Sequence, residues 1–187
     1  MSKQPLRTVP HGVMHVPVTP FKADNSVDYA TFEKLVDWHV RQKPSSLCVI
    51  LHIAESVSLT IEEHKKLIEI SVKVTNGRVP VIANVSSAGT DIAVDLARHS
   101  EKVGADATIC LAPYYWPVPE EALHDHFYRV AKAPLFDTAA HFDFKDAAAF
   151  AKLRPLMASV NAPGAAERDA LAYLAGGLLA KLLWQTR

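Results

Sequence analysis

The sequence predicts an α/β fold: an incomplete (β/α) TIM-type barrel with parallel strands, followed by C-terminal helices. One unit, an apolar strand and an amphipathic helix, occurs four times between residues 12 and 132. The strand starts lie about 28 to 35 residues apart, the length of a strand, a loop and a crossover helix. A complete eight-stranded barrel needs about 250 residues, and this chain has 187.

The expected strands are short apolar segments. Two of them are nearly continuous apolar runs, as is typical of parallel strands that are covered on both faces. The four segments are 12–18, 47–53, 79–85 and 107–112.

Helix signals stand between these strands. Asp28 can cap a first helix whose apolar face carries Phe32, Leu35, Val36 and Val40. Thr60 and Glu63 have the spacing of a capping box, which predicts the start of a second helix. Its inward residues are Ile61, Leu67, Ile68 and Val72.

A third helix begins at Thr90 or Asp91 and ends before Gly104, which suits a left-handed cap. The fourth covers residues 119–132, with a proline in its first turn. After Lys132 the pattern changes to one short strand, 134–136, and two helices, 145–159 and 165–185. We therefore divide the chain into an N-terminal extension (1–11), a partial barrel (12–145) and a C-terminal helical segment (146–187).

Composition excludes several classes of function. The chain has 20 basic and 20 acidic residues, so its net charge favours neither a nucleic-acid nor a membrane partner. Cys48 and Cys110 lie in apolar runs and are expected to be buried free thiols in a reducing cytosol. The polar N-terminus lacks the apolar core of a signal peptide. We therefore expect a cytoplasmic protein.

Several short motifs occur in the order and spacing of one family. They are Thr19-Pro20-Phe21 with Asp28, Glu55-Ser56-x-Ser58-Leu59-Thr60-x-x-Glu63-His64, residues 77–83, Gly104-Ala105-Asp106-Ala107, and Pro113-Tyr114-Tyr115 followed by His126-Phe127. In these motifs the chain resembles the dihydrodipicolinate synthase and N-acetylneuraminate lyase family of class I aldolases. The resemblance covers residues 12 to about 132 and implies a (β/α) barrel.

The resemblance also implies a chemistry. In the family, a lysine on the sixth strand forms a Schiff base with pyruvate or a related 2-oxo acid, without a metal or organic cofactor. Tyrosines and a threonine transfer protons, and the amides of a Gly-Thr-Thr-Gly-Glu turn hold the substrate carboxylate. Tyr115 matches the helper tyrosine of that relay.

The sequence departs from the family at other positions. Residues 51–55 read Leu-His-Ile-Ala-Glu, so Ile53 replaces the relay threonine and Ala54 replaces a glycine that can adopt angles costly to alanine. Lys145 is a superficial match to the sixth-strand lysine, about 24 residues too early. Alternatively, residues 134–137 and 153–156 resemble the C-terminal helices of the family, and the middle of the barrel is missing.

Each candidate has a plainer interpretation. His52 contacts a ligand or bonds a neighbouring carbonyl. Glu55 acts as a base or fixes the turn, and Thr19 is a structural hydroxyl that bonds adjoining backbone. Tyr115 lines the site or packs with Tyr114 and Trp116. His124 and His126 point about 200° apart on a helix and make a poor metal pair, so no metal is expected.

These observations give three hypotheses of function. The first is a lyase that acts on a small 2-oxo acid through a Schiff base, with Tyr115 and Lys145 catalytic and with His52, Ile53, Glu55 and Thr19 at the substrate. The second is a catalytically silent barrel fragment with a structural or subunit-association role. The third is a different activity, without a Schiff base, that His52 and Glu55 provide. A homo-oligomer is expected because half a barrel leaves strand edges unpaired.

Overall fold

The structure, a computed structural model, describes residues 10, 12–115 and 117–133. Its centre is a four-stranded sheet in the order β1-β2-β3-β4, in which each strand pairs in parallel with its neighbour in the sequence. The strands are β1 (Met14–His15), β2 (Ser46–Val49), β3 (Val81–Asn84) and β4 (Ala107–Ile109). The predicted parallel α/β architecture is thus confirmed for the first four units.

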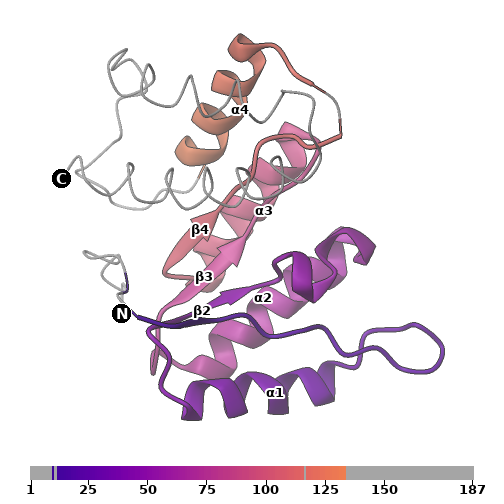
Figure 1. Ribbon diagram of the computed structural model, residues 1–187, viewed down its shortest axis with the longest axis vertical. Coiled ribbons are helices and arrows are strands. Elements are labelled where there is room, and N and C mark those ends of the chain that lie inside the picture. The colour runs from indigo at the N-terminus through magenta and orange to yellow at the C-terminus, as the bar shows by residue number, and fades with distance from the viewer. Residues whose placement is uncertain (1–9, 11, 116, 134–187) are drawn as a thin grey trace.

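A helix follows each strand. The helices are α1 (Tyr29–Arg41), α2 (Ile61–Thr75), α3 (Thr90–Val103) and α4 (Glu120–Lys132). They lie side by side in chain order, α1 against α2, α2 against α3 and α3 against α4 (Figure 1). No helix among the described residues is long and apolar enough to cross a membrane.

The predicted caps are present. The Asp28 side chain accepts a hydrogen bond from the Thr31 amide. Thr60 and Glu63 form both halves of the capping box, and Gly104 ends α3 with a φ of 89°, an angle that glycine adopts without steric cost. The start of α4 differs slightly from the prediction, because Pro119 is the cap that precedes the helix.

The core lies between the sheet and the helices. Leu47, Val49 and Val81 are fully buried and belong to one cluster with Phe32 of α1 and Leu67 of α2. This layer fixes the sheet against its helices, because each buried side chain of this size contributes about 1.5–3 kcal/mol.

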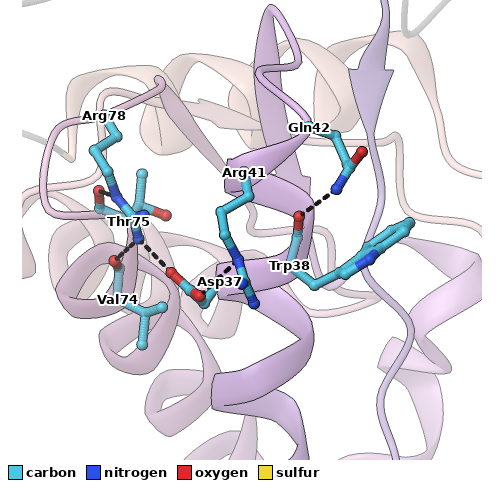
Figure 2. A network of polar contacts seen from close by, with 7 residues as sticks. All are labelled: Asp37, Trp38, Arg41, Gln42, Val74, Thr75 and Arg78. Atoms are coloured by element: carbon cyan, nitrogen blue, oxygen red, sulfur yellow. Dashed lines mark hydrogen bonds and ion pairs between the residues drawn. The ribbon is translucent and has the colours of Figure 1, made fainter.

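At the amino ends of the strands, charged groups tie the elements together (Figure 2). Asp37 of α1 accepts from Arg41 at 3.0 Å and from Arg78, which precedes β3, at 2.9 Å. Arg78 also donates to the carbonyls of Val74 and Thr75 at the end of α2. These contacts join α1 to the connection between α2 and β3.

The strands are shorter than predicted. The segment expected as a strand over 47–53 ends at Val49, because Ile50 takes a φ of 62° and the chain then enters a 3₁₀ turn. The other strands also cover only parts of 12–18, 79–85 and 107–112. The strand predicted at 134–136 and the helices predicted at 145–159 and 165–185 lie outside the described residues.

Candidate functional site

A double 3₁₀ turn follows β2 at the carboxyl end of the sheet. It consists of η1 (His52–Ala54) and η2 (Ser56–Ser58), between which Glu55 has a left-handed φ of 54°. The amides of Ala54 and Glu55 donate to the carbonyls of Leu51 and His52, both at 2.9 Å. These two amides therefore bond carbonyls within the turn and are not available to a ligand.

The turn is fastened to the segment that follows β1. Thr19 is buried, and its hydroxyl donates to the carbonyl of Ala54 at 2.7 Å. This agrees with the interpretation of Thr19 as a structural hydroxyl. Ala54 is fully buried within η1 and lacks the positive φ that would strain it, so the glycine expected there is not required by this turn.

Asn84, at the end of β3, connects the same turn to the next strand. Its side-chain amide donates to the carbonyl of Ile50 at 2.7 Å, and its side-chain oxygen accepts from the amide and hydroxyl of Ser86. His64 of α2 bonds the Asn84 carbonyl through Nε2 at 2.8 Å. Because Asn84 is only 2% exposed, these bonds are shielded from water.

The polar contacts continue to β4 and α4. The Ser86 hydroxyl accepts from the Leu111 amide at 2.9 Å. His126 of α4 is fully buried; its Nδ1 lies 3.0 Å from the Thr90 hydroxyl and its Nε2 lies 3.4 Å from the Cys110 sulfur. The ends of β2, β3 and β4 thus carry one series of neutral polar groups. Asn84, His64 and His126 are buried, and Ser86, Thr90 and Cys110 are half-buried.

The pair of Cys110 and His126 is not set up as a nucleophile and its base. Burial raises the pKa of the Cys110 thiol to about 12, and burial also lowers the pKa of His126. Both shifts favour the uncharged forms, whereas a reactive cysteine needs a lowered pKa and a thiolate. The contact therefore has a structural role at the carboxyl ends of the strands, which we call the rim of the sheet, and not a catalytic one.

The predicted site residues are distributed over this rim. His52, Ile53 and Glu55 are exposed on the turn after β2, Ile53 by 63%. Tyr115 is 67% exposed and follows β4, at the same end of the sheet. Lys145 lies outside the described residues. Trp116, against which Tyr115 packs in the plainer interpretation, also lies outside them.

Glu55 fixes the turn through its backbone. Its amide donates to His52 and its carbonyl accepts from Ser58 at 2.8 Å. The roles of His52, Ile53, Glu55 and Tyr115 toward a ligand stay predictions, because the structure gives their positions alone.

Sequence reasoning missed the residues that hold the rim together. Asn84 and Ser86 could have been found, since polar residues directly after a buried strand lie where parallel sheets form sites. Neither the spacing of His124 and His126 nor the motif His126-Phe127 indicates a buried, hydrogen-bonding role for His126. It points inward, whereas His124 stacks on Tyr128. Within the described ranges no three His, Cys, Asp or Glu side chains gather to hold a metal ion.

Comparison with known proteins gives one consistent match. Residues 9–138 match the model of the Dihydrodipicolinate synthetase family. A 4-hydroxy-tetrahydrodipicolinate synthase of Leptothrix cholodnii is 40% identical over 116 residues, which are 62% of this chain and 40% of that protein.

Solved structures give the same result. The dihydrodipicolinate synthase of Aquifex aeolicus superposes with a TM-score of 0.62 and 38% identity, covering 65% of this chain and 41% of that one. The chloride-inhibited dihydrodipicolinate synthase of Acinetobacter baumannii, complexed with pyruvate, gives a TM-score of 0.63 and 34% identity, covering 67% and 43%. The chain spans about two fifths of the length of the relatives it matches.

Proposed function

Because the chain belongs to the dihydrodipicolinate synthetase family, we propose that the carboxyl end of its sheet binds a small 2-oxo acid of the pyruvate type and serves lyase chemistry. The observation that carries the proposal is the turn after β2. It is fastened by Thr19 on one side and by Asn84 on the other, as a ligand-binding turn requires if it is to keep its geometry.

The turn offers hydrogen-bond donors for the carboxylate of an acid. With the amides of Ala54 and Glu55 committed inside the turn, the amides of His52 and Ile53 are the ones proposed to meet the substrate carboxylate. The imidazole of His52 is exposed beside them and can donate a further hydrogen bond. Tyr115, exposed after β4, is proposed to transfer a proton.

The covalent step is assigned to Lys145. Its neutral amine attacks the keto carbon, water leaves, and the iminium that forms withdraws electrons from the neighbouring carbon. No metal or organic cofactor takes part in this proposal. The protein is proposed to act in the cytoplasm as a homo-oligomer.

A second candidate is binding without turnover. Ile53 supports it, because a hydrocarbon side chain stands exposed at the position that aligns with the relay threonine and it cannot pass a proton. In this case the half-barrel retains its packing and an association role, while the Schiff base does not form.

Reductive trapping separates the two candidates. The full chain is incubated with pyruvate and sodium borohydride, which reduces an iminium to a stable secondary amine, and the adduct is mapped by peptide mass spectrometry. An adduct on Lys145 that is lost in Lys145→Arg and retained in Lys152→Arg supports the lyase. Pyruvate binding by calorimetry without any adduct supports binding alone, and the absence of both refutes the proposed site.

A further inference from the structure

We propose that His15 and His39 form a two-histidine binding site for a divalent transition ion of the imidazole-binding class, such as Zn²⁺, Ni²⁺ or Cu²⁺. His15 ends β1, and His39 lies in the last turn of α1. Their Nδ1 atoms are 3.1 Å apart, and the rings meet edge to face with centroids separated by 5.1 Å.

The separation of the two nitrogens suits a shared ion. With metal–nitrogen bonds of about 2.05 Å, a separation of 3.1 Å corresponds to an N–metal–N angle of about 98°. This value lies between about 90°, as in square-planar or octahedral sites, and about 109°, as in tetrahedral ones. An ion bound by both Nδ1 atoms is therefore compatible with either geometry, once the rings turn so that both lone pairs face it.

The proton balance is also favourable. Without metal, one Nδ1 carries a hydrogen and donates it to the other. Both Nδ1 atoms become ligands when the donor ring moves its proton to Nε2, so no net proton is released.

The groups around His15 and His39 position the two rings and leave them partly accessible to solvent. Trp38 meets the His39 ring edge to face at 4.9 Å between centroids. Both histidines are half-buried. In the described part of the chain no third His, Cys, Asp or Glu completes a cluster.

The site lies at the amino end of the sheet, away from the candidate substrate turn. The short strand β1 is one edge of the described sheet, and its two ladder pairs join it to the first two residues of β2. An ion held by both imidazoles links this strand to α1. We infer that its effect is to fix the edge strand, and that it does not take part in the proposed lyase chemistry.

Titration with ZnCl₂ and CuCl₂ tests the site in the full chain. We expect one Zn²⁺ site by calorimetry whose affinity falls about 100-fold in His15→Gln or His39→Gln, since the second imidazole binds intramolecularly. His124→Gln, a histidine on α4, is the matched control and should leave the affinity unchanged. The Cu²⁺ form should show two imidazole nitrogens by pulsed electron paramagnetic resonance.

Equal affinity in the wild type and in His39→Gln would overturn the proposal. If a glutamine variant does not fold, the wild type alone decides. Substoichiometric Cu²⁺ should broaden the ring resonances of His15 and His39 before those of the other histidines in NMR spectra. Broadening elsewhere first refutes the site, and neither readout depends on catalytic activity.

Discussion

The two ends of the sheet are held together by different chemistry. At the carboxyl end, neutral groups such as Asn84 and Thr19 bond backbone carbonyls of neighbouring connections and are buried. At the amino end, Asp37 pairs with Arg41 and Arg78, whose side chains are 64% and 43% exposed. The carboxyl end therefore depends on shielded hydrogen bonds and the amino end on charges in contact with water.

The difference has energetic consequences. A buried polar atom that loses its partner costs about 1–3 kcal/mol, because it cannot turn to water instead. An exposed ion pair contributes about 0–1 kcal/mol, since water replaces much of its attraction. We expect the carboxyl end to be rigid and sensitive to substitution, and the amino end to tolerate change.

Thiol labelling gives the largest expected effect. Burial raises the pKa of both Cys48 and Cys110 to about 12, from an ordinary value of 9.0, so their thiolate fraction at pH 8 falls by about a thousandfold. Ellman's reagent should label both thiols at least a thousandfold more slowly in the native protein than in urea. Fast native labelling of a Cys48→Ser variant would show that Cys110, near the carboxyl rim, is not shielded.

Asn84→Ala tests the carboxyl end directly. It removes the bonds to the Ile50 carbonyl and to the amide and hydroxyl hydrogens of Ser86, so the free energy of unfolding should fall by about 2–3 kcal/mol. Urea denaturation followed by circular dichroism measures this. A loss below about 0.5 kcal/mol would remove the contrast between the two ends.

The next largest effect is expected from acid, which should lower the free energy of unfolding through groups at the carboxyl end. Burial lowers the pKa of His64 and of His126 below the ordinary 6.5, so above pH 6.5 both are neutral in the folded and unfolded states. Below it the unfolded state binds protons first, and stability falls by up to about 1.4 kcal/mol per pH unit for each histidine.

Unfolding curves between pH 7.5 and 5.0 measure this slope. His64→Gln and His126→Gln should each make it shallower. His39, whose pKa is also lowered, adds to the slope in all of these proteins. A flat profile would mean that the buried histidines bind protons without cost.

The smallest effect is expected at the amino end. Asp37→Ala should cost no more than about 1 kcal/mol, because both of its ion pairs are exposed. The difference from the wild type should shrink further in 0.5 M NaCl, which screens exposed charges. A cost equal to that of Asn84→Ala would reverse the comparison.

The caps and the order of parallel βα units could be predicted from the sequence, whereas the strand ends and the long-range side-chain contacts could not. The capping box of Thr60 and Glu63 depends on residues three positions apart, and it was found. The end of β2 was misplaced because Ile50 continues an apolar run, although its φ of 62° is unusual for a β-branched residue. The bond from Asn84 that meets this turn comes from 34 residues away.

For the candidate site, too, the positions of single residues could be predicted from the sequence and their long-range contacts could not. The resemblance of short motifs placed Ile53 and Tyr115 at one end of the sheet, where the structure also has them. The series from Asn84 to His126 could not be read from spacing, because it joins side chains from three βα units through contacts that only the folded chain brings together.

The order of the strands has a consequence for biosynthesis. Each strand pairs with the one that precedes it in the chain, so no pairing in this sheet waits for a distant segment. Pairing neighbouring strands closes shorter loops than pairing strands that lie further apart in the sequence, so it costs less conformational entropy. The sheet can grow unit by unit as the polypeptide leaves the ribosome, because each folded βα unit offers its strand edge to the strand that is synthesised next.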